Sequence, residues 1–247
     1  GRLGTGVRTC ALRIYAGLAA AWAAAGTPLA GFVLASELVG LTRVRGAGDA
    51  YPAVTALVAL AREVRAKLGA SEKLVYAADW TEYGAHVRDG GATIRFPLDA
   101  LFADAAIDAV GIDYYPPLSD WRDGDAHADA ALSPTVYDRA YLKSRLGAGE
   151  AFDWYYASDA DRAAQTRTPI TDGAYQKPWI YRAKDLVAWW SSPHIARDGG
   201  VETRATGWVP GPTPIWLPEI GVAAVGRRPH GPNALPDPAS PGAALPP

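Results

Sequence analysis

A chain of 247 residues is long enough to form one α/β domain with a substantial hydrophobic core. Its composition, with 49% hydrophobic and 20% charged residues, is that of a globular protein. The formal net charge of −2 gives no support for nucleic-acid binding. The sequence also lacks an apolar run near the roughly 18 residues that a membrane span requires.

The cysteine, histidine and methionine content bears on disulfides, on metal sites and on whether the chain is part of a longer protein. The single cysteine, Cys10, cannot form an internal disulfide and has no metal-binding spacing around it. The four histidines show no mutual metal-ligand spacing, so we expect no metal. We also expect no cofactor, because the two-carboxylate mechanism considered below needs none. Methionine is absent and the chain starts at Gly1, so we expect a piece of a longer protein, whose export cannot be judged from a missing signal peptide.

The first part of the chain alternates predicted helices with short buried strands. Apolar residues recur at helical spacing over 7–25, in an alanine-rich background. A continuous apolar run over 29–36 is typical of a strand that is buried on both faces in a parallel sheet, and it ends at Glu37. A second amphipathic helix is predicted over 52–68, with Pro52 in the first turn.

The same alternation continues and is then interrupted. Residues 73–78 and 107–112 predict two more buried strands, with a short helix over 97–104 between them. A long insertion follows at 116–213, for which we expect two helices, near 137–146 and 182–190.

The chain ends with one more strand and a tail. Residues 214–218 predict a fourth strand, which delivers Glu219. Residues 222–247 are rich in proline and glycine and show no periodicity, which indicates a loop or disordered tail.

Four short strands separated by helices predict a parallel α/β fold, either doubly wound or a closed barrel. No glycine-rich phosphate-binding loop follows any strand, which argues against the doubly wound alternative. Acidic and aromatic residues follow every strand, where (β/α)8 barrel enzymes carry their sites. We therefore expect residues 1–221 to be an incomplete TIM barrel, spanning about strands four to seven.

Two glutamates follow different predicted strands, with two further strands between them. A retaining glycosidase needs one protonated and one ionised carboxyl group about 5 to 5.5 Å apart. Glu37 and Glu219 fit that requirement by position. Their interval resembles that of the large clan of retaining barrel glycosidases, in which the acid/base ends the fourth strand and the nucleophile ends the seventh. The alternative is that each glutamate caps a strand or forms a salt bridge.

Further candidate residues for substrate binding lie after the second and third strands and in the insertion. Those after the strands could equally anchor loops, and the insertion aromatics could equally be packing residues. The candidates are Asp79, Trp80, Glu82, Asp113, Tyr115, Trp121 and Trp154. Asp113 and Tyr115 share one face of the chain, so one of them could instead hold the nucleophile by a hydrogen bond.

Several long motifs resemble the barrel-like domain of gene transfer agent and phage tail proteins. The resemblance runs from about residue 10 to residue 240, and the motifs include Ser36-Glu-Leu-Val-Gly-Leu-Thr42, Tyr76-Ala-Ala-Asp-Trp-Thr-Glu-Tyr83, Val110-Gly-Ile-Asp-Tyr-Tyr-Pro-Pro-Leu-Ser-Asp-Trp-Arg-Asp123 and Phe152-Asp-Trp-Tyr-Tyr-Ala-Ser158. In that family the domain is a glycoside hydrolase-like module of a large hub protein at the tip of a phage-like tail.

The resemblance implies a function and its partners. We expect a retaining glycoside hydrolase, with Glu37 as acid/base and Glu219 as nucleophile, that acts on bacterial envelope polysaccharide or on peptidoglycan glycan. The expected partners are that carbohydrate and other tail proteins, and the expected location is the tail of a phage-like particle made in the bacterial cytoplasm. The alternative is a structural or receptor-binding tail module that binds glycan without turnover, because fold alone does not decide function.

Overall fold

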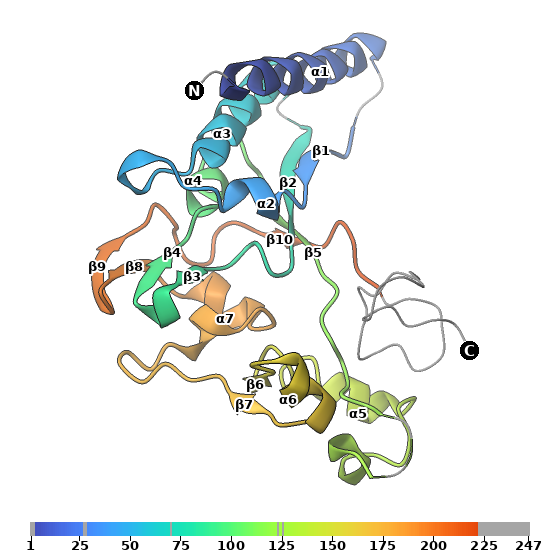
Figure 1. Cartoon of the computed structure of the whole chain (residues 1–247). Helices are drawn as coiled ribbons and strands as arrows, with labels where there is room; N and C mark the ends of the chain where they lie inside the picture. The colour runs from blue at the N-terminus through green and yellow to red at the C-terminus, as the bar shows by residue number, and fades with distance from the viewer. Residues whose placement is uncertain (1–2, 27–28, 70, 123, 125, 222–247) are drawn as a thin grey trace. The chain divides into compact units, whose positions relative to one another are not determined.

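The computed structural model describes residues 3–26, 29–69, 71–122, 124 and 126–221 (Figure 1). The tail expected over 222–247 lies outside the described residues. The chain divides into two compact units. The first comprises Gly1–Asp113 with Trp190–Pro218, and the second comprises Tyr114–Trp189 with Glu219–Pro247.

A four-stranded parallel sheet forms the centre of the first unit. Its strands are β1 (Gly31–Ser36), β2 (Lys73–Asp79), β5 (Ala109–Asp113) and β10 (Ile215–Trp216), in the order β1-β2-β5-β10. All three pairings are parallel, which confirms the predicted parallel α/β sheet. The burial expected for β1 on both faces is wrong, because β1 is an edge strand in which only Leu34 is buried and Val33 is exposed. Strand order follows chain order without the reversal of a doubly wound sheet. Among the described strands the sheet is open, with β1 and β10 at its edges.

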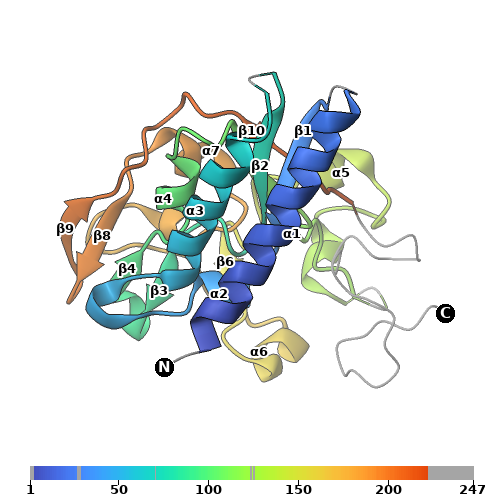
Figure 2. The same cartoon turned by 90° about the horizontal axis from the view of Figure 1, so that it is seen from above.

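Helices follow the strands of this unit as a βα repeat requires. The helix α1 (Leu3–Ala25) packs beside α3 (Pro52–Arg65), as Figure 2 shows from above. The predicted apolar stripe of α3 is confirmed, because Val54, Leu57, Leu60, Ala61 and Val64 are buried. Two shorter helices, α2 (Val39–Thr42) and α4 (Asp99–Phe102), contact α3.

A second, antiparallel sheet in the first unit was not predicted. It consists of β3 (His86–Arg88), β4 (Thr93–Arg95), β8 (Ile195–Asp198) and β9 (Val201–Ala205), paired in the order β3-β4-β8-β9. The turn between β8 and β9 uses Gly199 and Gly200 at φ of 59° and 82°, which glycine adopts without strain.

A buried histidine ties α4 to this second sheet. The ring of His194 stacks between Phe96 and Trp208, with centroid distances of 4.5 and 5.2 Å. His194 Nδ1 lies 2.9 Å from Asp99 Oδ2, and the Thr206 hydroxyl donates to the same carboxylate. These contacts make His194 a packing residue of the first unit.

The second unit contains short elements joined by long loops. They are η3 (Ala128–Ala131), α5 (Arg139–Ser144), β6 (Trp154–Tyr155), α6 (Asp159–Ala164), β7 (Thr168–Pro169) and η4 (Pro178–Tyr181). The two helices expected here are present in shortened form, as α5 and as α7 (Leu186–Ser191). The remaining short helices that the structure describes belong to the first unit, and they are η1 (Ala47–Asp49) and η2 (Asp89–Gly91).

None of the described helices is both long enough and apolar enough to cross a membrane.

Candidate functional site

Three parallel strands of the first unit bring predicted site residues to one edge of the sheet. Asp79 and Asp113 are register partners at the carboxyl ends of β2 and β5. Ser36, the last residue of β1, donates from Oγ to Asp113 Oδ2 at 2.7 Å. Asp113 is fully buried and Ser36 is exposed, so this hydrogen bond joins β1 to β5 at the edge of the core.

Glu37 lies directly after β1 and is exposed. Its backbone N–H donates to the carbonyl of Ala77 at 2.8 Å, which extends the β1–β2 pairing by one residue. Its φ of 52° lies in the left-handed region, where a residue with a Cβ is strained. Such strain persists only where the surrounding structure holds it, and it is common at functional sites.

Glu82 is buried, with only 2% of its surface exposed. Its Oε1 accepts from Tyr76 Oη at 2.8 Å and from Thr42 Oγ1 at 2.5 Å, and its Oε2 accepts from the Asp79 N–H at 3.2 Å. Burial raises the pKa of Glu82, although these three hydrogen bonds oppose the shift. Glu82 thus lies beneath the turn that follows β2. Its contact with substrate stays a prediction.

Asp79 and Trp80 are half-buried in the turn that leads to Glu82. Asp79 Oδ1 accepts from the N–H of Thr81 at 2.7 Å and from its hydroxyl at 2.5 Å. A guanidinium from the neighbouring loop, that of Arg43, donates to the Thr81 carbonyl. Burial lowers the pKa of Arg43, and the negative charges of Glu82 and Asp79 oppose that shift. A positive charge therefore accompanies the carboxylates at this edge.

The second unit places Tyr115 beside Glu219. Tyr115 Oη donates to Glu219 Oε2 at 2.8 Å, and the Tyr114 N–H donates to the Glu219 carbonyl at 2.8 Å. Tyr114 and Ile220 form a parallel bridge next to this contact. The sequence left open whether Asp113 or Tyr115 would hold Glu219, and in the structure Tyr115 makes this bond while Asp113 accepts from Ser36.

The two insertion tryptophans are half-buried and have close ring partners in the second unit. Trp121 meets His127 edge-on at a centroid distance of 4.4 Å. Over the Trp154 ring lies the Arg167 guanidinium, 4.3 Å from its centroid, and Tyr156 contacts that ring edge-on at 5.0 Å. A sugar ring that stacks on Trp154 would therefore have to use the part of the Trp154 ring that Arg167 and Tyr156 leave uncovered.

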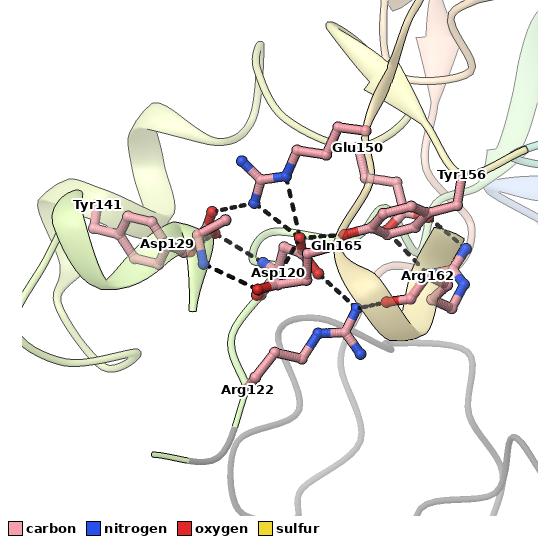
Figure 3. Close-up of polar contacts among 10 residues, drawn as sticks. Asp120, Arg122, Asp129, Tyr141, Glu150, Tyr156, Arg162 and Gln165 are labelled. Atoms are coloured by element: carbon pink, nitrogen blue, oxygen red, sulfur yellow. Dashed lines mark hydrogen bonds and ion pairs between the residues drawn. The ribbon is translucent and has the colours of Figure 1, made fainter. Parts of the chain in front are cut away.

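A cluster of charged and polar side chains forms the interior of the second unit (Figure 3). Asp120 and Asp129 are both buried, and Arg167 bridges them at 2.8 and 2.6 Å. Two tyrosines complete the cluster, because Tyr156 donates to Asp120 and Tyr141 donates to Asp129. With this many donors the two aspartates are satisfied structural carboxylates, since buried charges are retained where they are paired.

The predicted residues thus fall into two groups, one in each unit. Glu37, Asp79, Trp80, Glu82 and Asp113 belong to the first unit. The second unit holds the others, Tyr115, Trp121, Trp154 and Glu219. Within each group Asp79, Glu82, Asp113 and Glu219 have the carboxylate contacts given above. The spacing between the Glu37 and Glu219 carboxyl groups stays a prediction.

Residues 11–247 match the GTA TIM-barrel-like domain family. The chain belongs to this family. No curated protein matches the chain. Membership confirms the resemblance to gene transfer agent barrel-like domains, and it associates this GTA domain with gene transfer agent particles.

Two polar residues of this GTA domain site were missed from sequence. Tyr76 lies inside the apolar run of β2, where it reads as a core residue, although a buried tyrosine hydroxyl usually finds a partner. Ser36 ends β1 and was noted only as part of a motif. The pattern Asp79-Trp80-Thr81-Glu82 resembles a capping box, in which the fourth residue accepts from the first N–H, and that signal could have indicated the inward position of Glu82.

The described part of the GTA domain contains no cluster of three or more histidine, cysteine or acidic side chains that could hold a metal ion. A groove of about 420 Å³ lies between α3 and the second sheet, and its walls include Tyr51, Val54, Arg62, Arg95, Phe96 and Arg204. The guanidinium of Arg62 is paired with Asp104 at 2.7 Å, and that of Arg95 with Asp49. None of the predicted site residues lines this groove.

Proposed function

We propose that this GTA module is a retaining glycoside hydrolase that acts on bacterial envelope polysaccharide or on the glycan of peptidoglycan. The observation that carries the proposal is the hydrogen bond from Tyr115 Oη to Glu219 Oε2. A donor on one carboxylate oxygen orients the other oxygen toward an anomeric carbon, as a nucleophile requires. Glu37 is exposed directly after β1, a position that suits an acid/base residue.

The proposed reaction has two steps. In the first, Glu37 transfers its proton to the glycosidic oxygen while the bond from that oxygen to the anomeric carbon breaks and Glu219 bonds to the carbon. In the second, a water attacks the same carbon, the Glu37 carboxylate takes its proton, and Glu219 leaves as a carboxylate. Each step inverts the anomeric centre, so the product retains the configuration of the substrate, and the two carboxyl groups supply all of the acid, base and nucleophile chemistry.

Of the remaining predicted residues, Asp79, Trp80 and Trp121 would bind the sugar chain. Trp80 and Trp121 have the flat apolar faces on which sugar rings pack, and the carboxylate of Asp79 is a hydrogen-bond acceptor for hydroxyl groups. We place the module in the particle tail, in contact with other tail proteins, where an enzyme of this kind would meet the envelope of a recipient cell. This placement rests on the resemblance to tail hub proteins.

Two substitutions test the roles of the glutamates in the protein expressed from its complete reading frame. Glu219→Gln keeps size and hydrogen bonding but removes the nucleophile, so hydrolysis of envelope glycans should fall to background. Glu37→Gln should lose the natural glycan yet still react with activated aryl glycosides, whose leaving groups need little protonation. Azide should rescue this second variant only, because a small anion attacks the glycosyl intermediate without a general base.

The same experiment distinguishes an enzyme from a binding module. Reducing ends released from purified envelope glycan measure turnover, and sedimentation with insoluble glycan measures binding. If the wild-type protein binds glycan but releases no reducing ends, and both variants bind equally well, the hydrolase proposal is wrong and the module is a glycan-binding component of the tail.

A further inference from the structure

The backbone at Glu37 needs an explanation in the residues around it. Glu37 is one of few described non-glycine residues with a positive φ, here 52°, and it directly follows a strand. For a residue with a Cβ this conformation is unfavourable, so the residues around it must hold it in place. The direction of the Glu37 side chain depends on this backbone, because the backbone dihedrals fix the Cα–Cβ bond.

A buried tyrosine holds the peptide that follows Glu37. The Leu38 N–H donates to Tyr76 Oη at 3.0 Å, while the Glu37 N–H donates to the Ala77 carbonyl at 2.8 Å. Two successive N–H groups are thereby bound to neighbouring residues of β2. Tyr76 is fully buried, so its ring has no freedom to follow a moving loop.

Glu82 in turn fixes the tyrosine hydroxyl. Because Tyr76 Oη accepts from the Leu38 N–H, its own proton is directed to Glu82 Oε1, at 2.8 Å. The same Glu82 oxygen accepts from Thr42 Oγ1, at the end of α2, the helix that begins two residues after Glu37. Glu82 therefore restrains the Glu37 turn along two routes, one through β2 and one through α2.

We propose that Tyr76 and Glu82 are positioning residues for Glu37, which hold its left-handed turn and so aim its carboxyl group. This inference rests on the proposed function, in which Glu37 is the acid/base. Neither residue touches substrate in this arrangement, because both side chains are buried beneath the turn. Their effect on proton transfer is exerted through the position of Glu37.

This role predicts a dependence on the leaving group. A displaced acid transfers its proton poorly, and misplacement by about 1 Å can reduce a rate roughly 100-fold. Tyr76→Phe should therefore lower kcat on natural glycan by about 10- to 100-fold, with KM nearly unchanged. Activated aryl glycosides need little proton transfer, so the first step should slow much less with them. In Glu82→Gln the side chain has only one acceptor oxygen for its three donors. The orientation that keeps this oxygen on the Asp79 N–H turns an N–H group toward Tyr76 Oη, which should lower kcat in the same way.

A double-mutant cycle with Glu37→Gln separates positioning from general damage to the fold. If Tyr76 acts through the Glu37 carboxyl group, adding Tyr76→Phe to Glu37→Gln should change the remaining activity on aryl glycosides by less than about twofold. Equal losses on both substrate types, or a full second loss in the double variant, would overturn the proposal. Tyr141→Phe is the matched control, because it removes a buried tyrosine hydroxyl that donates to Asp129 in the second unit.

Backbone hydrogen exchange supplies a readout that needs no turnover. Tyr76→Phe should speed exchange at the Leu38 amide by at least about tenfold, whereas Tyr141→Phe should leave that amide unchanged. If the wild-type protein hydrolyses no glycan, the proposed function fails, and the exchange rates still decide whether Tyr76 holds the turn. Unchanged exchange at Leu38 in both Tyr76→Phe and Glu82→Gln would overturn the inference whatever the activity.

Discussion

Asp129 is a carboxylate whose surroundings favour its charged form. Burial alone would raise its pKa, but hydrogen bonds from the Tyr141 hydroxyl, the Asp120 N–H and the Arg167 guanidinium outweigh burial, and the pKa of Asp129 is lowered (Figure 3). A carboxyl group with a depressed folded-state pKa stabilises the protein above its unfolded-state pKa. That contribution is lost as the pH falls through the folded-state pKa.

Asp129→Asn should therefore destabilise the second unit in a pH-dependent way. An amide has only one acceptor oxygen, so either Arg167 loses this one hydrogen bond, or the Asp120 N–H and the Tyr141 hydroxyl both lose theirs, at a cost of about 2 to 3 kcal/mol near neutral pH. In urea unfolding, the difference between wild type and variant should shrink as the pH falls below 3.8. Asp159→Asn, a charge change on an exposed position, should change stability by less than about 0.5 kcal/mol. A difference that stays constant down to pH 2 would contradict this assignment.

At the scale of single residues, the sequence predicted where a site residue lies along its strand better than it predicted the contacts of its side chain. Asp113 ends the buried strand β5 and Glu37 follows the edge strand β1, so the parallel pattern alone put them at one edge of the sheet. Whether a side chain then points outward depends on the turn that carries it. Glu82 is drawn inward by three donors, from Tyr76, Thr42 and the Asp79 backbone, and two of these lie on other elements.

At the scale of elements, the approach of β5 to β2 depends on a glycine. A Cβ added at Gly111 would lie 2.6 Å from the Tyr76 carbonyl oxygen and 2.6 Å from Val75 Cγ1. Both atoms belong to the neighbouring strand of a buried sheet and cannot move cheaply. Gly111→Ala should therefore reduce the free energy of unfolding by about 1 to 3 kcal/mol, measured by urea unfolding.

A matched glycine in a helix provides the control for this substitution. Gly17 lies inside α1, and nothing lies within 4 Å of the position where its Cβ would be. Gly17→Ala should stabilise the helix by about 0.5 to 1 kcal/mol, because alanine has the higher helix propensity. If both substitutions shifted the unfolding midpoint in the same direction, the close approach at Gly111 would not be the cause.

Elements with a strong pattern were predictable and those without it were not. The strands β1, β2 and β5 are short continuous apolar runs, and α3 has a complete apolar stripe. Each of these patterns is typical of the element that the structure shows. The strands of the second sheet are only three to five residues long and carry mixed side chains. Their pairing joins β4 to β8 across about a hundred residues of sequence, which no local pattern encodes. Two glycine turns signal that sheet locally, Gly90-Gly91 between β3 and β4 and Gly199-Gly200 between β8 and β9.

At the scale of the whole molecule, strand order constrains the proposed catalytic pair. Glu37 follows β1 and Glu219 lies three residues after β10, and these strands are the two edges of the parallel sheet. In a flat sheet, strands three positions apart are separated by roughly 14 Å, far beyond the reach of a shared sugar. The 5 to 5.5 Å that retention needs therefore requires the inward curvature of a barrel, where side chains from strand ends converge.

The last prediction joins this geometry to the stereochemistry of the product. In an experimental structure of the complete domain, the Glu37 and Glu219 carboxyl groups should lie roughly 4 to 7 Å apart, and NMR of the first product formed should show the anomeric configuration of the substrate. A separation of about 6.5 to 9.5 Å with inverted product would assign Glu219 as a general base that activates a water. The two measurements are independent, so a separation beyond about 12 Å together with no product would remove these glutamates as a catalytic pair.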